Sequence, residues 1–518
     1  MGTLLPRRWI SPRGHVAQRV CQAPVCVLLC LGSSGIALAQ GAPSFLITPS
    51  VSLSETVTTN AGLAGSGGQS DAVTRGSLGV NLRNRSGRSQ ASIDYSLSAL
   101  AYARQSELNT TQQSLNASLD MEWWERRGFL RAGAAISQGA VSAFGAQPSA
   151  SSLPTANSTE VRTLQIGPRW QGPLGGDLRF SAQADWTTTD AQSGSNGDST
   201  SSTVQVQVSP NRPGPLGWSV QAIQLGGDFK AGSATGSTRV FGSLSRSFDD
   251  LDLQWSANAG YERGDIVSST NQGSSTWGMG LAWTPSPRTA ADLKFDRRLF
   301  GNSHSLSLQH RTPLTVWRIT SSRALNQSGN TLAAGAAGGV YDLYFAQFAS
   351  IEPDPIRRAD LVNAFLAQNG LSAASPVDAG FLRSAATIDN RQEISAAWRG
   401  VRSTATLTYG RNLSRRANPD IVAADDLAAS STVRTTNWSL SLTHRLTPDL
   451  SAGASASLQS GDGAALGQSN RQRVFSTQIG GPLGPKSTWS LLLRRALFDN
   501  QLTPYGESTA TASYTVRF

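Results

Sequence analysis

Apolar and polar residues alternate along most of the chain. From Leu251 to Tyr261 every second residue is Leu, Trp, Ala or Tyr, and the residues between them are Asp, Gln, Ser, Asn and Gly. The same period of two runs through residues 93–99, 178–186 and 438–443. A period of two indicates β-strands with one apolar and one polar face.

The alternating segments run to about 10 to 15 residues, longer than most strands of soluble proteins and long enough to cross a bilayer at a tilt. A soluble sandwich would show shorter strands and a buried face rich in Val and Ile. Here the apolar face is Leu, Ala and aromatic, and aromatic residues stand near segment ends, as in an interfacial girdle. These aromatic residues are Trp123, Trp186, Tyr261, Trp489 and Tyr514.

Short and long links between the segments alternate. A short link at 84–87 follows a long one at 60–71, and a short one at 125–128 precedes a long one at 139–158. One link, at Gly301 and Asn302, is short where a long one is expected. This order predicts an all-β fold, a transmembrane antiparallel up-and-down β-barrel of about 22 strands, within about 20 to 24, with short periplasmic turns.

The last residues complete this pattern. Tyr514, Val516 and Phe518 lie on one face of a final strand. That strand must pair with the first one, because an open sheet edge in lipid leaves backbone groups without partners. We interpret these three residues as the signal that the barrel-assembly machinery recognises, which makes that machinery an expected partner.

Residues 1–39 have the features of an export signal. Four arginines precede an apolar stretch from Val25 to Leu38, and Ala37-Leu38-Ala39 has the spacing of a cleavage site. A short membrane anchor is the alternative. All three cysteines lie in this segment, so residues 40–518 form a barrel without disulfides, and we expect it in the bacterial outer membrane.

The long link at 326–390 interrupts the alternation. Asp354 and Pro355 fit the start of a helix, Leu361 and Phe365 belong to an apolar stripe, and Gly370 fits its end. We therefore expect one helix-containing loop inserted in the barrel. It either closes the lumen as a plug or lid, or it is a solvated decoration.

The charge balance changes the picture little. The chain has a net charge of +10, which falls to +6 without the four arginines of the signal. It has no basic run and no nucleic-acid-binding motif, so we expect no nucleic-acid partner.

The polar face carries the candidate site. Nine basic residues fall on the face opposite the apolar one, and rings of Arg and Lys favour anions in pores. One hypothesis is a lumen that prefers anionic solutes or acidic polysaccharide; the alternative is that these charges form salt bridges with acidic neighbours. The nine are Arg83, Arg179, Arg239, Lys294, Arg298, Arg311, Arg402, Arg445 and Arg494.

Catalytic chemistry finds little support. His304, His310 and His444 are the only histidines after the signal, and no nucleophile elbow or matching acid accompanies them. There is no Walker loop, no zinc-ligand spacing and no Rossmann fingerprint. We expect no enzyme activity, no cofactor and no metal site.

Two stretches carry a family resemblance. One is the opening strand, with Ile47, Pro49, Glu55, Thr56 and Asn60; the other is the insertion at 353–370, with Pro353, Asp354, Pro355, Arg358 and Gly370. Both resemble the outer-membrane barrels associated with PEP-CTERM/exosortase and exopolysaccharide loci.

This resemblance implies a barrel linked to polysaccharide or surface-protein export, acting as a passive porin-like conduit or a docking component. The alternative is a structural or surface-binding barrel with an occluded lumen and no transport role. The expected partners are outer-membrane lipid and lipopolysaccharide, anionic polysaccharide and export-system proteins.

Overall fold

The computed structural model describes residues 45–518, apart from 148–152, 193–196, 213, 233, 421–423, 466, 502 and most of 330–379. In that last range only Phe345, Phe348, Glu352, Arg358, Leu361 and Val362 are described. The predicted export signal at 1–39 lies outside the described residues.

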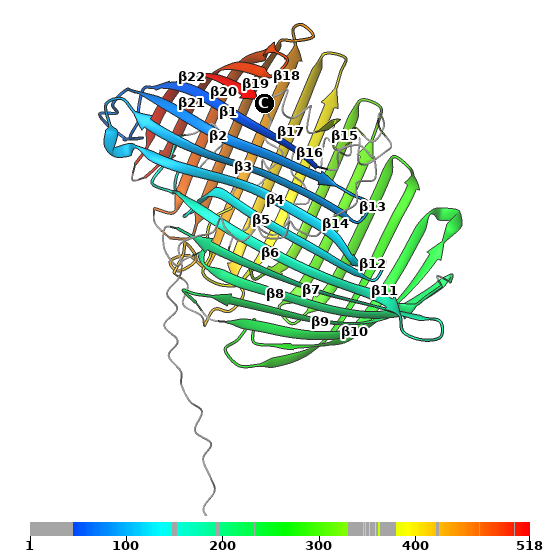
Figure 1. The fold of residues 1–518 in the computed structure, drawn as a ribbon. Helices are drawn as coiled ribbons and strands as arrows, with labels where there is room; N and C mark the ends of the chain where they lie inside the picture. The colour runs from blue at the N-terminus through cyan, green and yellow to red at the C-terminus, as the bar shows by residue number, and fades with distance from the viewer. Residues whose placement is uncertain are drawn as a thin grey trace, which may run out of the picture. The chain divides into compact units, whose positions relative to one another are not determined.

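Twenty-two strands account for most of the described chain (Figure 1). The first eleven are β1 (Phe45–Thr58), β2 (Asp71–Arg85), β3 (Ser89–Tyr102), β4 (Thr110–Trp124), β5 (Gly128–Ala140), β6 (Ser158–Pro173), β7 (Leu178–Ala191), β8 (Ser199–Pro210), β9 (Leu216–Phe229), β10 (Thr235–Phe248) and β11 (Leu253–Gly264). The others are β12 (Gln272–Ser286), β13 (Thr289–Arg298), β14 (Gly301–Arg311), β15 (Thr315–Asn326), β16 (Thr387–Arg399), β17 (Ser403–Arg416), β18 (Thr432–Arg445), β19 (Ser451–Gly463), β20 (Ser469–Gly484), β21 (Ser487–Asn500) and β22 (Tyr505–Arg517).

Helical structure is minor in the described part of the chain. The named helical elements there are two 3-10 turns, η1 (Ser106–Leu108) and η3 (Asp249–Leu251). None of the helices in this part is long and apolar enough to cross a membrane. The helix expected from Asp354 to Gly370 lies largely outside the described residues; within it, Arg358, Leu361 and Val362 are helical.

The strands close into one barrel. Each strand pairs antiparallel with the next, and β22 pairs with β1, so the first and last strands lie side by side in Figure 1. The closing register pairs Ser50 with Arg517 and Thr58 with Thr509. The expected up-and-down barrel of about 22 strands is confirmed.

The two faces of each strand differ as the alternation predicts. Leu53 (57 % exposed), Leu244 (53 %) and Leu493 (60 %) point away from the barrel axis, whereas Thr58, Glu262 and Thr509 on the other face are buried. A closed sheet with an apolar outer surface satisfies its backbone groups internally and exposes apolar side chains to lipid. The protein is therefore a β-barrel of the bacterial outer membrane.

The two ends of the barrel differ in their links. At one end, which we call the short-turn end, the links have two to five residues; at the other, the long-loop end, they reach 60 residues between β15 and β16. The link between β13 and β14 at the long-loop end has only two, Leu299 and Phe300. Short turns face the periplasm and long loops face outside in barrels of this class.

Candidate functional site

The nine basic candidates occupy different depths of the wall. Eight belong to strands and lie on the face opposite the lipid-exposed apolar residues, while Arg402 lies in the turn between β16 and β17. Their partners divide them into two groups.

The first group is held by carboxylates, most tightly on β10 to β13. Arg239 is 6 % exposed, and its guanidinium donates to Asn258 Oδ1 at 2.9 Å, Asp296 Oδ1 at 3.2 Å and Thr276 Oγ1 at 3.3 Å. These three partners come from β11, β13 and β12. One guanidinium on β10 thus connects four adjacent strands.

Arg298 makes the second buried pair of this region. Its Nε and Nη2 donate to Glu262 at 2.8 and 2.7 Å, and the Leu299 amide donates to the same carboxylate at 3.1 Å. The Glu262 side chain is fully buried. A buried carboxylate held bidentately by arginine is neutralised and strongly oriented.

The remaining pairs of this group lie elsewhere in the wall. Arg494 Nη1 lies 2.7 Å from Glu507 Oε2, with both side chains 2 % exposed, and Thr58 Oγ1 donates to the same carboxylate across the β1–β22 closure. Two exposed pairs complete the set, Arg83 with Asp94 at 3.3 Å and Lys294 with Asp292 at 3.5 Å. For these five basic residues the salt-bridge alternative describes the arrangement.

The second group lies at the short-turn end and binds neutral acceptors. Arg179 Nε donates to Ser209 Oγ at 3.3 Å, Arg311 Nη2 to the Pro287 carbonyl at 3.4 Å, and Arg445 Nη2 to the Val401 carbonyl at 2.8 Å. The carbonyl of Arg402 accepts from the Arg445 amide. Within the described residues none of these four arginines has a carboxylate partner.

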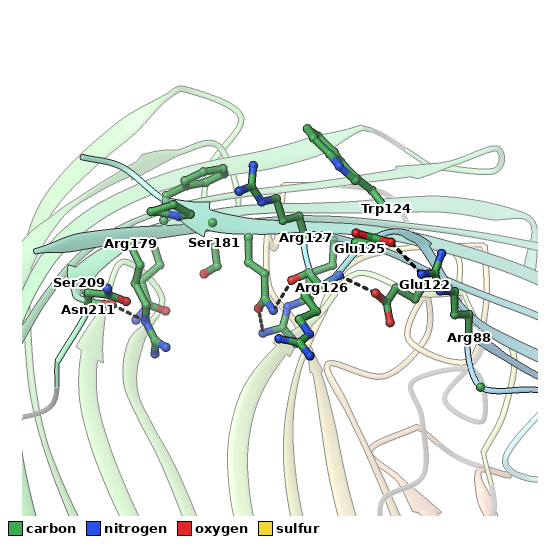
Figure 2. A pocket seen from close by; sticks show the side chains of 17 residues that line it. Arg88, Glu122, Trp124, Glu125, Arg126, Arg127, Arg179, Ser181, Ser209 and Asn211 are labelled. Carbon is green, nitrogen blue, oxygen red and sulfur yellow. Dashed lines mark hydrogen bonds and ion pairs between the residues drawn. The ribbon is translucent and has the colours of Figure 1, made fainter. Parts of the chain in front are cut away.

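A pocket of about 1180 Å³ opens beside Arg179 at this end (Figure 2). Its wall holds five arginines against two glutamates: Arg88, Arg126, Arg127, Arg169 and Arg179, with Glu122 and Glu125. Of the five, Arg88 is the one with a carboxylate partner in the described part of the chain, Glu125 at 2.8 Å. We call this the mouth pocket.

The turn between β4 and β5 places two of these arginines on opposite faces. Arg126 has a φ of 54°, a left-handed conformation that reverses the chain, and its amide donates to the Glu122 carboxylate. In Figure 2 Arg126 and Arg179 point to the same side of the sheet, with Ser209 and Asn211, whereas Arg127 and Trp124 point to the other. The sequence did not single out Arg126 or Arg169. Arg126 lies in a turn, outside the alternation, and Arg169 is one of several polar residues on its strand.

The three histidines each meet a hydroxyl group. His310 Nδ1 lies 2.9 Å from Thr289 Oγ1, His444 Nδ1 2.8 Å from Ser403 Oγ, and His304 Nε2 3.1 Å from Ser321 Oγ. Thr289 and Ser403 are the direct cross-strand neighbours of their histidines. Across the described chain no carboxylate is hydrogen-bonded to any of the three, so a base held by an acid is not formed there.

At the long-loop end the last part of the 326–390 insertion, which no sequence pattern singled out, joins segments that are far apart in the sequence. We call residues 380–386 the crossing segment. Phe381 forms a parallel bridge with Ala140 at the end of β5, and the Leu382 amide donates to the Ala140 carbonyl at 3.1 Å. Ser384 donates from its amide to Asp425 Oδ2 at 2.6 Å, in the loop between β17 and β18.

Apolar side chains from several loops pack against the crossing segment. Phe381 and Ala385 form one buried cluster with Ala143, Leu427 and Val433. Ala386 joins a second with Phe229, Ile266, Phe300, Ile388 and Ala417, and Leu382 a third with Val161 and Ala191. The long-loop end therefore has a small apolar core that none of the strand patterns predicts.

Asp426 fastens the loop after β5 to this core. Its carboxylate accepts from the Ala143 amide at 2.6 Å and from Ser142 Oγ at 2.9 Å. Burial raises the pKa of Asp426 above its ordinary value, against the opposing effect of these hydrogen bonds.

Comparisons with known proteins assign no family. No family model matches the chain, and no curated protein matches it. Solved structures with a similar fold include the FrpB iron transporter of Neisseria meningitidis (TM-score 0.46, 10% identity, covering 91% of this chain and 81% of that one). They also include the siderophore receptor PirA of Pseudomonas aeruginosa (0.35, 11%, 91% and 80%) and OccK5 (OpdH) of the same species (0.32, 10%, 91% and 98%).

Proposed function

We propose that this barrel is a passive conduit for anionic solutes, with an attracting mouth in the periplasm and a gate at the outer end. The observation that carries the proposal is the mouth pocket, where the side chains of Arg126, Arg169 and Arg179 have no carboxylate partner among the described residues. The resemblance drawn from the sequence implies polysaccharide or surface-protein export, and the arginine-rich polar face favours an acidic polysaccharide as the solute.

The distribution of charge supports this direction of selectivity. Deep in the wall Arg239, Arg298 and Arg494 are neutralised by carboxylates within 3.2 Å. At the mouth Arg169 donates to Gln171 and Arg179 to Ser209, both neutral acceptors. Unneutralised guanidinium groups at an entrance raise the local concentration of anions and exclude cations.

The crossing segment supports a gate rather than an open channel. It is held at Ala140 on one side and at Asp425 on the other, so it runs between walls that are far apart in the sequence. An opening motion would have to break these contacts.

Planar-bilayer recording in a salt gradient tests the selectivity. The wild-type barrel is expected to show a reversal potential of anion-selective sign, and the combined variant R126Q, R169Q and R179Q to move it toward zero. The charge-matched variant R263Q, R297Q and R323Q, on the lipid-side face at the other end, should keep the wild-type value. Cation selectivity in the wild type would refute the proposal.

A second candidate function is a structural or surface-binding barrel with a closed lumen. The apolar clusters around Phe381, Ala386 and Leu382 favour it, because a buried core of this kind is costly to open. It predicts no conductance in the wild type and none after replacement of residues 380–386 by a Gly-Ser linker, whereas the gated conduit should then leak.

The export role has its own test in cells. Deleting the gene should reduce the acidic polysaccharide released into the medium and leave it in the periplasm, and the wild-type gene should restore release. Unchanged release would refute the export role. The anion selectivity of the barrel would still be tested separately by the bilayer recording.

A further inference from the structure

The outer surface of β17 to β21 carries a concentration of one charge near the long-loop end. Six arginines share this surface with two aspartates, Asp462 and Asp499. The six are Arg411 and Arg415 on β17, Arg434 on β18, Arg471 and Arg473 on β20, and Arg495 on β21. We call this set the arginine patch.

Strand alternation sets the direction of these side chains. Arg411 follows the lipid-exposed Leu407 by four residues, Arg473 precedes Phe475 by two, and Arg495 follows Leu493 by two. Residues an even number apart on a strand share a face. Leu407 is 42 % exposed, Phe475 50 % and Leu493 60 %, so the patch lies on the lipid-facing side.

Register brings the patch together across the strands. Arg434 pairs with Leu413 on one side and with Asp462 on the other, and Arg471 pairs with Asp499. Directly opposite residues in an antiparallel pair lie about 5 Å apart. The arginines therefore form one surface rather than isolated charges.

The patch borders the apolar belt at the depth of outer-leaflet headgroups. Tyr409 and Trp438 contact each other below it in a tilted arrangement, with ring centroids 4.4 Å apart, and Leu440 is 51 % exposed beneath them. Aromatic side chains of this kind mark the boundary between hydrocarbon and headgroups. Arg415 and Arg434 lie within three residues of the long-loop ends of their strands.

Two aspartates against six arginines leave part of the patch's positive charge without an internal counter-charge. Arg473 is paired with Asp499 at 2.7 Å, and Arg495 donates to Ser508 Oγ at 2.7 Å. Arg411, Arg434 and Arg471 have no carboxylate partner in the described part of the chain.

Elsewhere on the same surface the charges are mixed. Glu160 and Arg162 of β6 pair with each other at 2.8 Å, and Glu55, Asp190 and Asp228 bring single negative charges to β1, β7 and β9. Single arginines on β11, β13 and β15 are separated by uncharged strands. The concentration of positive charge is thus particular to β17–β21.

We propose that the arginine patch binds the phosphate groups of a phosphorylated glycolipid of the outer leaflet. Guanidinium groups offer planar, bidentate donors that match phosphate oxygens. The acyl chains of the same lipid would lie on the apolar belt formed by Leu440, Phe475 and Leu493. A ligand with phosphates above several acyl chains matches both parts of the surface.

Titration of lipid A into the purified full-length barrel in neutral detergent, followed by tryptophan fluorescence, tests the site. The variant R411Q, R434Q and R471Q is expected to bind about tenfold or more weakly, since it loses three charge-assisted contacts. The lysine variant R411K, R434K and R471K should recover part of the affinity.

The variant R263Q, R297Q and R323Q is the charge-matched control and should bind as the wild type does. Retention of heat-modifiable mobility in SDS shows that each variant is folded.

Three further ligands identify the source of the phosphate. Dephosphorylated lipid A should bind the wild type as weakly as lipid A binds the glutamine variant. Phosphatidylglycerol and inorganic phosphate should each bind at least about tenfold more weakly than lipid A. Equal binding of phosphatidylglycerol would overturn the glycolipid, and equal binding of dephosphorylated lipid A, or an unaffected glutamine variant, would overturn the site itself.

Discussion

Arg383 Nη1 lies 2.7 Å from Asp389 Oδ2, and the guanidinium is completely buried. The same side chain donates to Thr387 Oγ1 at 2.7 Å and Ser414 Oγ at 3.2 Å. These contacts fix the crossing segment to the first residues of β16 and to β17. This buried ion pair adds to the apolar clusters that hold the crossing segment.

Replacing this arginine should release the crossing segment. R383M leaves Asp389 without its partner and is expected to cost about 3–5 kcal/mol of local stability. Hydrogen exchange at the Leu382, Arg383 and Ser384 amides should become faster. R131M, which removes an exposed partner of Asp120, is the control and should leave these amides unchanged. Unaltered exchange in R383M would mean that the apolar clusters alone hold the segment.

Two carboxylates on the inner face, Glu262 and Asp292, should differ sharply in their contribution to the free energy of unfolding. E262L removes the buried partner of Arg298 and should lower the free energy of unfolding by about 3–5 kcal/mol. D292N removes the exposed partner of Lys294 on β13 and should cost about 0–1 kcal/mol. Urea unfolding of the barrel in lipid vesicles measures both, and equal losses would contradict the assigned importance of burial.

Asp426 predicts a pH dependence of the loop that follows β5. Burial raises its pKa, so between its ordinary value and the raised one the folded protein holds more protons than the unfolded protein. The free energy that holds the loop therefore falls as pH rises through this window. A nitroxide at V141C should become more mobile from low pH toward neutral, and D426N should abolish the change. A wild-type label whose mobility falls with rising pH would reverse the sign and refute the account.

Phe518 predicts a separation of assembly from stability. Its side chain is 63 % exposed, and its amide donates to the Pro49 carbonyl at 3.0 Å. F518A keeps that backbone contact, so the folded barrel should unfold at the wild-type urea concentration. The yield of barrel in the outer membrane should nevertheless fall, because the proposed assembly signal is lost. Y505A, at the other end of β22, serves as the comparison for yield.

The strands were predictable because the surroundings of a strand's two faces determine its own pattern of apolar and polar residues. Lipid outside and polar groups inside impose a period of two. This period predicted the short link between β13 and β14 two residues late, at Gly301 and Asn302, where the structure has Leu299 and Phe300. The alternation also placed Arg239 and Glu262 on the inner face. It does not contain the tilt or the register, so the contact between Arg239 and Asp296, three strands away, could not be read from it.

The loops were less predictable for the opposite reason. The crossing segment has no period, since its residues contact different walls one after another. Arg126 escaped notice because it lies in a turn whose left-handed backbone breaks the alternation. A surplus of arginine near the short turns was the only available signal for the mouth pocket.

The reach of Arg239 across four strands also has a mechanical consequence. When a β-barrel is pulled out of a membrane by one end of its chain, hairpins that contact only their two neighbours should come out one at a time. Here the guanidinium of Arg239 on β10 is hydrogen-bonded to β11, β12 and β13, and so connects two hairpins. Under load these two hairpins should come out in a single step at a higher force, and R239Q should divide that step in two.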